Sequence, residues 1–436
     1  MVIPERIERK YEPYPEYRDS GVEWLAKVPT QWNIIRLKYG VSLINDKVEN
    51  GESDTPYLGL ENVESWTGRI IETDFKPEIG GASNSFRKDD VLFGKLRPYL
   101  AKAVHAQYHG ICTSELMVLR PQKYYSRFLF YYMLSPSTVN IIDSSTYGVK
   151  MPRANWHFIG NLPVVVPPMP EQQAIADFLD RETARIDEMI ARKQRLIELL
   201  QEQRTALITR IVTKGLSSDV PMKDSGVEWL GEIPANWEVK KLKYVAEIIT
   251  GNTPPKSDPG NYDELEGLPW IKPDNLGSFL PVSASQEYLS AKGATLARIV
   301  PKEAILTCCI GSIGSIGIAG CELSTNQQIN SVVFSGQRVH HKYGFYMVYA
   351  SLPEYRKLAN LNVVAIINSQ SQKTIPIPLP PLPEQQTIAD YLDQETARID
   401  NLVGRINQAI EKLQEYRSAL ITAAVTGKID VRQHVS

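Results

Sequence analysis

The sequence repeats itself, and this repeat constrains the fold more than any single motif. Residues 19–25 read DSGVEWL and are followed by Pro29 and Trp32, and the same pattern returns at 224–230, at an offset of 205. A second block, Pro170–Asp187, returns as Pro383–Asp400 with three positions changed, at an offset of 213. Because both blocks occur twice, we predict two copies of one structural frame.

The stretches inside the frame, about 33–168 and 238–381, show no convincing similarity to each other. Their lengths differ by the eight residues that separate the two offsets. A repeated frame that carries two unlike modules implies that the modules recognise two different targets from symmetric positions in one molecule. A chain of 436 residues is long enough for two or three domains with separate cores.

The repeat predicts four parts: an N-terminal arm and first module (1–168), a central helix (169–215), a second module (216–381) and a C-terminal helix (382–436). The arm before Asp19 is rich in Tyr, Pro and Arg and has no counterpart in the second half. We predict an extended segment there and assign it no role.

The second repeated block predicts a long helix. Pro170 and Glu171 suit a helix start, and Gly215 suits its end. Apolar residues follow at alternating steps of three and four, if Lys193 and Arg204 are counted as polar interruptions, which is the pattern of a coiled-coil seam. The seam residues are Ile186, Ile190, Ile197, Leu200, Leu207 and Ile211 in the first copy and Ile399, Val403, Ile406, Ile410, Leu413 and Leu420 in the second.

The partner of each helix is predicted to be the other, in an antiparallel pair that spaces the two modules. The alternative is that each apolar stripe packs within its own module. The modules themselves contain short apolar runs bounded by turn residues, at 90–94, 116–119, 304–307 and 329–334. We therefore expect an α+β protein in which two α/β modules are joined by two long antiparallel coiled-coil helices with an internal pseudo-two-fold repeat.

Positive charge is concentrated in the modules, although the whole chain carries a net charge of -2. Residues 87–153 hold ten Lys or Arg against four Asp or Glu, and residues 288–378 hold eight against three. Cations and amides near strand ends suit contacts to phosphates and base edges. The candidate DNA-binding residues are Lys95, Arg97, Tyr99, Lys102, Lys150 and Arg153 in the first module and Lys272, Ser312, Ser315, Asn326, Gln327 and Gln328 in the second.

Motifs of catalysis are not found in the sequence. It lacks the carboxylate cluster of a nuclease, the cofactor loop and Asn/Asp-Pro-Pro-aromatic motif of an adenine methyltransferase, and the G-x-S-x-G elbow. The segment Gly251–Ser257 resembles a P-loop only faintly. The six His and four Cys have no metal-ligand spacing, so we expect no metal site and buried thiols. No segment suits a signal peptide or a membrane span, which predicts a cytoplasmic protein.

These features resemble the specificity subunits of bacterial type I restriction-modification systems. The resemblance covers nearly the whole chain and rests on the two GVEWL segments, the two Pro-Glu-Gln-Gln helix starts, the two Thr-Ala-Arg-Ile-Asp segments, residues 92–99 and residues 325–327. It implies that each module is a target recognition domain for one half of a bipartite asymmetric DNA site. It also implies that the chain is not an enzyme and binds no cofactor itself.

The resemblance further implies the partners. Such subunits bind double-stranded DNA and recruit two methyltransferase subunits, which use S-adenosylmethionine. In the full complex, restriction subunits use ATP and Mg to translocate and cleave DNA. Two rival hypotheses remain open, an enzyme with a diverged site and a scaffold that binds only proteins. Trp24 and Trp229 are either partner contacts or core residues.

Overall fold

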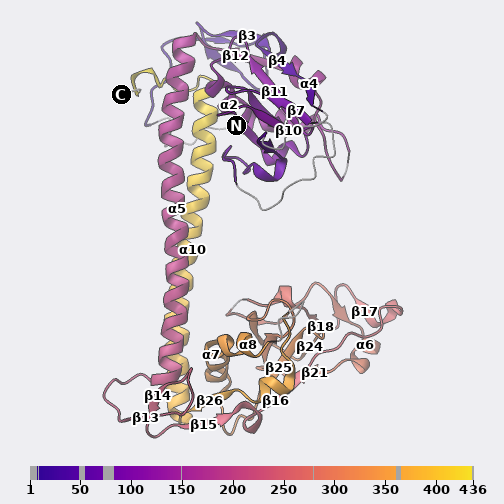
Figure 1. Cartoon of the computed structure of the whole chain (residues 1–436), viewed down its shortest axis with the longest axis vertical. Helices are drawn as coiled ribbons and strands as arrows, with labels where there is room; N and C mark the ends of the chain where they lie inside the picture. The colour runs from indigo at the N-terminus through magenta and orange to yellow at the C-terminus, as the bar shows by residue number, and fades with distance from the viewer. Residues whose placement is uncertain are drawn as a thin grey trace. The chain divides into compact units, whose positions relative to one another are not determined.

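The computed structural model describes residues 7, 9–48, 55–71, 83–148, 150–277, 279–359 and 365–434. The chain forms two compact units, the first comprising 1–194 and 406–436 and the second comprising 195–405 (Figure 1). Each unit holds one module and part of each long helix. Within the described ranges, no helix is both long and apolar enough to cross a membrane.

The first module is built on two small sheets. Its strands are β4 (Val41–Ile44), β5 (Lys47–Val48), β6 (Tyr57–Leu58), β7 (Ser83–Phe86), β8 (Val91–Gly94), β9 (Ala103–His105), β10 (Gly110–Thr113) and β11 (Leu116–Pro121). One sheet has the order β4-β11-β8-β9 and is antiparallel throughout. The other has the order β5-β7-β10-β6, with β10 and β6 parallel.

The second module also has two sheets. Its strands are β16 (Ala246–Thr250), β17 (Tyr262–Asp263), β18 (Leu268–Ile271), β19 (Pro281–Val282), β20 (Tyr288–Leu289), β21 (Ile299–Val300), β22 (Ile305–Cys308), β23 (Ile316–Ala319), β24 (Leu323–Thr325) and β25 (Ile329–Phe334). The orders are β16-β25-β22-β23-β19 and β17-β20-β18-β24-β21.

The two modules share a topology although their sequences are unlike. The order β4-β11-β8-β9 corresponds strand for strand to β16-β25-β22-β23, and β7-β10-β6 corresponds to β21-β24-β18. The corresponding pairs β10–β6 and β24–β18 are both parallel. The four predicted apolar runs form β8, β11, β22 and β25, so their prediction as strands is confirmed.

Short helices cover these sheets. They are α2 (Ser126–Leu134), α3 (Pro136–Ser144) and α4 (Trp156–Asn161) in the first unit and α6 (Ala291–Leu296), α7 (His341–Ala350), α8 (Leu352–Leu358) and α9 (Ser369–Lys373) in the second. Single 3-10 turns lie at η1 (Leu37–Tyr39), η2 (Leu60–Asn62), η3 (Pro98–Leu100), η4 (Leu242–Tyr244), η5 (Pro259–Asn261), η6 (Pro273–Asn275) and η7 (Arg432–His434). Helices α2 and α7 are almost wholly buried in the cores of their units.

The DSGVEWL segments form equivalent structures. Each lies in a β-hairpin, β1 (Tyr17–Asp19) with β2 (Lys27–Pro29) and β13 (Met222–Asp224) with β14 (Glu232–Pro234). A second strand pair follows in each unit, β3 (Asn33–Arg36) with β12 (Pro163–Val166) and β15 (Glu238–Lys241) with β26 (Pro376–Leu379). Trp32 and Trp237 are fully buried, and Trp24 and Trp229 pack half-buried against the cores.

Both predicted long helices are present. Helix α5 spans Met169–Lys214 and α10 spans Leu382–Val425. Gly215 has a φ of +76° and its N–H donates to the carbonyl of Ile211 (3.0 Å), which ends α5 as predicted. Within each unit the α5 and α10 segments lie side by side (Figure 1). All predicted seam residues are buried or half-buried, whereas most residues between them are exposed.

The N-terminal arm packs against the first unit. Ile7, Tyr11 and Tyr14 are buried, and the Tyr11 ring lies 5.2 Å from that of Phe178 on α5. The arm also contacts the C-terminal tail, because the N–H of Asp430 donates to the carbonyl of Glu12 (2.7 Å) and the Tyr17 hydroxyl donates to that of Lys428 (3.3 Å). The arm therefore belongs to the core of this unit.

Candidate nucleic-acid interface

Residues 95–99, directly after β8, hold three of the predicted DNA-binding residues, and hydrogen bonds hold their backbone in place. The N–H of Lys95 donates to the carbonyl of Glu115 (2.9 Å), and that of Arg97 donates to Pro152 (2.8 Å). Arg97 has a φ of +49°, a left-handed conformation that costs energy for any residue with a Cβ. Its side chain is exposed, as is that of Tyr99. The loop thus presents a cation and an aromatic ring to solvent.

Residues 147–148 and 150–156 lie next to this loop. The backbone of Arg153 forms isolated β-bridges with Leu96 and with Tyr147. Its guanidinium donates two hydrogen bonds to the Glu115 carboxylate (3.0 and 3.2 Å). Lys150, three residues before Arg153 in the sequence, is exposed to solvent. A cavity of about 490 Å³ brings these segments together, and its lining includes Lys47, Lys95, Glu115, Tyr147, Arg153 and Trp156.

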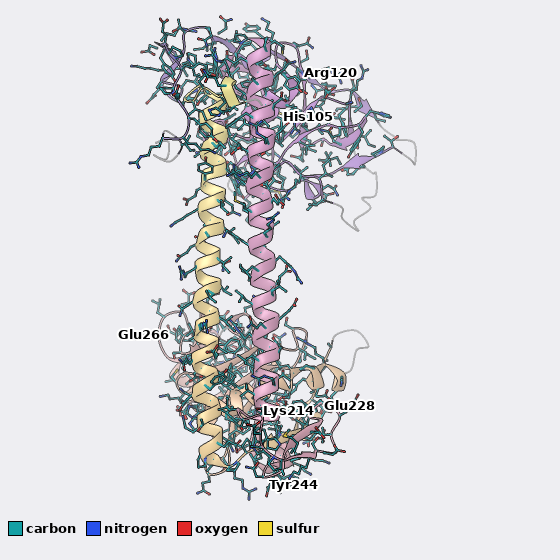
Figure 2. The ribbon with its side chains drawn as sticks, turned by 90° about the vertical axis from the view of Figure 1, so that its left-hand side faces the viewer. His105, Arg120, Lys214, Glu228, Tyr244 and Glu266 are labelled. Atoms are coloured by element: carbon teal, nitrogen blue, oxygen red, sulfur yellow. The ribbon has the colours of Figure 1, made fainter. Side chains whose placement is uncertain are left out.

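Some cations of the first module are engaged within the protein. The Lys102 ammonium, predicted to face DNA, donates to the backbone carbonyl of Leu60 (2.6 Å). Arg120 pairs with the buried Asp90 (2.8 Å), and Figure 2 shows Arg120 and His105 on this module. Burial lowers the pKa of His105, and the nearby charge of Arg127 adds to the shift. The charge excess of the sequence is therefore only partly available to a ligand.

The glycine-rich loop of the second module follows β22. Ser312 is exposed and Ser315 half-buried. At Gly314 the Arg356 guanidinium occupies the space where a Cβ would lie. At Gly311 that space is open, and the residue has a φ of +76°.

Three amide residues lie between β24 and β25. Asn326 is buried, and its Nδ2 donates to Oε1 of Gln328 (2.8 Å), whose N–H returns a bond to Asn326 Oδ1 (3.1 Å). Gln327 is exposed and accepts a hydrogen bond from the Thr253 hydroxyl. Thr253 belongs to the segment that only faintly resembled a P-loop, so its proximity to the amides was missed.

Lys272 follows β18, which is parallel to β24, so it lies at the same end of the sheet as the three amides. Its ammonium pairs with Glu287 and lies 4.9 Å from the centre of the Trp270 ring. This cation is thus held by protein groups. Its role in DNA binding stays a prediction, as do the roles of the other candidate residues.

The cysteine thiols lie in unreactive surroundings. Cys112, Cys308 and Cys309 are buried and Cys321 is half-buried. Burial raises the pKa of the thiols of Cys112 and Cys309 to about 12. Neutral buried thiols are poor nucleophiles.

The repeated Pro-Glu-Gln-Gln segment fastens each long helix to its module. Oε1 of the buried Gln172 accepts from the N–H of Tyr125 (2.8 Å), and Nε2 donates to the carbonyls of Lys123 (3.1 Å) and Pro167 (2.8 Å). Because these hydrogen bonds satisfy the buried amide, they fix the start of the helix relative to the module. In the second unit Gln385 makes the same bonds with His340, Arg338 and Pro380.

About two turns further along, each helix carries an aspartate that binds the module. Asp180 pairs with Arg127 and accepts from the Tyr131 hydroxyl (2.6 Å). Arg127 was counted as part of the basic surface, but it serves this internal contact. In the second unit Asp393 makes the matching bonds with Lys342 (2.6 Å) and Tyr346 (2.8 Å).

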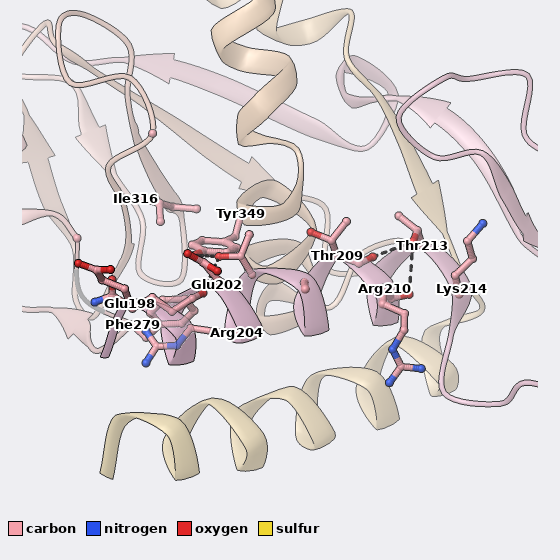
Figure 3. A pocket seen from close by; sticks show the side chains of 15 residues that line it. Glu198, Glu202, Arg204, Thr209, Arg210, Thr213, Lys214, Phe279, Ile316 and Tyr349 are labelled. Carbon is pink, nitrogen blue, oxygen red and sulfur yellow. Dashed lines mark hydrogen bonds between the residues drawn. The ribbon is translucent and has the colours of Figure 1, made fainter. Parts of the chain in front are cut away.

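The helices are also joined to each other by charged residues of the seam. In the first unit Arg417 pairs with Asp187 (2.9 Å), and in the second Arg204 pairs with Asp400. The members of the two pairs are related by the repeat offset of 213. Arg204 also stacks over Phe279 (4.9 Å), as Figure 3 shows. Arg204, which the sequence suggested was a polar interruption, is therefore a cross-helix contact.

The arrangement agrees with comparisons to known proteins. Residues 42–199 and 234–412 match the type I restriction modification DNA specificity domain. The chain is 25% identical to the putative type I restriction enzyme MjaX specificity subunit of Methanocaldococcus jannaschii, over 94% of this chain and 96% of that protein. It is 24% identical to the MjaVIII specificity subunit of the same organism, over 93% and 95%.

A solved structure supports the fold. It was solved to show the structural basis underlying complex assembly and conformational transition of the type I R-M system. One of its chains matches this chain with a TM-score of 0.71 and 19% identity, over 91% of this chain and 98% of that chain. With the family match over both modules, this chain belongs to the type I restriction-modification DNA specificity family.

Proposed function

We propose that this chain is the subunit that selects the DNA sequence for a type I restriction-modification complex, with each module reading one half of a bipartite asymmetric site. One observation carries the proposal. The two modules share a common core of strands and are attached to their helices by the same repeated contacts, yet their candidate surfaces carry different side chains. Two recognition surfaces on a common frame suit two different half-sites.

The long helices would set the distance between the half-sites and recruit partners. We propose two methyltransferase subunits and, in the full complex, restriction subunits. S-adenosylmethionine, ATP and Mg would then bind to those partners. The repeated helix segments suit this role because a partner present in two copies needs two equivalent binding surfaces.

The test is to co-express the chain with the methyltransferase subunit of its own host and to map methylated adenines by single-molecule sequencing. We expect methylation at one split, asymmetric motif that is lost when this chain is omitted. Methylation that is absent, or that does not depend on the chain, would favour the scaffold that binds only proteins. Nuclease activity of the purified chain would favour the enzyme with a diverged site.

A further inference from the structure

The candidate surfaces of the two modules can be matched residue by residue through their backbone hydrogen bonds. In the first module the bonds run from Lys95 N to Glu115 O (2.9 Å), from Ala154 N to Lys95 O (2.9 Å) and from Arg97 N to Pro152 O (2.8 Å). In the second they run from Cys309 N to Gln328 O (2.8 Å), from Ile367 N to Cys309 O (2.9 Å) and from Gly311 N to Ala365 O (2.9 Å).

Isolated bridges extend the match. Leu96 pairs with Arg153, and Ile310 pairs with Ile366. Glu115 therefore corresponds to Gln328, and Arg153 corresponds to Ile366. The same backbone carries an ionic pair in one module and an amide with an aliphatic side chain in the other.

The first module combines a guanidinium with a carboxylate. The Arg153 and Glu115 side chains are 43% and 22% exposed and line the 490 Å³ cavity together. Glu115 accepts from Nε and Nη2 of Arg153, which leaves Nη1 to donate elsewhere. Arginine donates to O6 and N7 of guanine, and glutamate accepts from N4 of cytosine. The pair offers the groups that recognise the two bases of one G·C pair.

The second module offers different chemistry at these positions. Asn326 donates to Oε1 of Gln328, which orients the Gln328 amide and leaves its Nε2 to donate elsewhere. Ile366 is 44% exposed. A glutamine amide binds N6 and N7 of adenine, and an apolar side chain contacts the methyl group of thymine. These are the groups that recognise an A·T pair.

We infer that the first module reads a G·C base pair with Arg153 and Glu115, and that the second module reads an A·T base pair with Gln328 and Ile366 at the corresponding step of its half-site. This inference rests on the proposed function. It adds the chemical class of base that each module selects and the residues that select it.

The test exchanges the two pairs. Complexes of the chain with its methyltransferase subunit are incubated with duplexes in which each base pair of the mapped site is randomised in turn, and the retained duplexes are sequenced. In the variant E115Q with R153I, we expect preference at one base pair of one half-site to change from G·C to A·T. The variant Q328E with I366R should change one base pair of the other half-site from A·T to G·C.

Matched variants separate base reading from charge. Arg153→Lys keeps the charge but loses the planar fork of the guanidinium, so discrimination at that G·C pair should fall about 10-fold or more while the rest of the site is unchanged. A uniform loss for all sequences would identify Arg153 as a phosphate contact and overturn the inference. Leu216→Ala, at an exposed position that belongs to neither pair, is the control that should leave the preference of both modules unchanged.

A measurement on the DNA keeps the test valid if an exchanged chain does not fold. Each guanine of the half-site read by the first module is replaced by 7-deazaguanine, which lacks N7, and binding of the wild-type complex is measured. We expect about a 10-fold weakening at one guanine. No weakening at any guanine would overturn the inference. A wild-type complex that selects no split site would instead refute the proposed function.

Discussion

In each unit the end of one long helix packs against the β-hairpin and the buried tryptophan of the repeated frame. The two units form this junction in different ways. In the second unit, the end of α5 at Gly215 continues through residues 216–221 into β13, so the chain itself closes the junction. In the first unit, the end of α10 at Gly427 is followed by the C-terminal tail, and the strand that corresponds to β13 follows the N-terminal arm. Gly215 lies against Trp237 and Gly427 lies against Trp32.

Non-covalent contacts replace the missing peptide connection in the first unit. The Lys428 ammonium donates to the carbonyls of Leu25 (2.8 Å) and Lys27 (2.6 Å), and Ile429 and Val431 are buried. In the second unit the Lys214 ammonium donates to the carbonyl of Glu232, which corresponds to Lys27. The comparison teaches that the repeated frame specifies the junction, whether or not the chain is continuous there.

The largest effect should come from breaking the helices, which both units share. Substituting Ile190→Pro and Val403→Pro should abolish assembly with the methyltransferase subunit and DNA binding together, because each proline in a helix interior costs about 3 kcal/mol or more. Ile190 lies in the first unit and Val403 in the second. Size-exclusion chromatography and a DNA mobility shift measure the two losses. Unaltered DNA binding would refute the role of the helices.

The non-covalent junction should be the more easily broken of the two. Ile429→Ala with Val431→Ala removes buried aliphatic groups and should destabilise the first unit by about 2 to 5 kcal/mol. Hydrogen exchange should then accelerate in the β1–β2 hairpin but not in the β13–β14 hairpin. Leu216→Ala, at a half-exposed position of the second unit, is the control and should change stability by less than about 0.5 kcal/mol.

The paired tryptophans test the next smaller difference. Trp32 Nε1 donates to the buried Glu171 carboxylate (2.9 Å), whereas Trp237 Nε1 has no hydrogen-bond partner among the described residues. Trp32→Phe should therefore destabilise its unit by about 1 to 3 kcal/mol more than Trp237→Phe, because it leaves a buried carboxylate without its donor. Thermal unfolding of the two variants measures the difference. Equal losses would show that the hydrogen bond contributes little.

The smallest effect concerns Arg97 and Gly311, which share one backbone position. Arg97→Gly should stabilise the first unit by about 1 kcal/mol, because glycine adopts a positive φ without strain, while DNA binding weakens. Gly311→Ala should destabilise the second unit by a similar amount, since only the backbone conformation and no neighbour opposes the added Cβ. Denaturant unfolding and DNA mobility shifts give both quantities. An Arg97→Gly variant that binds DNA normally would remove Arg97 from the interface.

Local sequence patterns predicted the elements well. The seam spacing, the proline and glutamate at the helix start and Gly215 at its end are signals within a few residues, and α5 follows them closely. The strands β8, β11, β22 and β25 likewise follow apolar runs between turn residues. Such signals depend on neighbours in the chain and are therefore visible in the sequence.

Contacts between distant residues could not be predicted in this way. Arg153 pairs with Glu115, Lys102 with the Leu60 carbonyl, and Arg356 lies at Gly314. These partners are brought together by sheet topology, and the shared topology itself is hidden because the two modules fill their cores with different residues. The sequence repeat did contain one unused signal, since Asp187 and Arg204 recur as Asp400 and Arg417.

The most direct test of the account is to replace residues 33–168 with the corresponding module of another member of the family and to map the methylated sites of the complex that results. The account predicts a new sequence in one half of the split motif, with the other half unchanged, because each module is fastened to the frame by its own set of contacts. A chimera in which both halves change would contradict it.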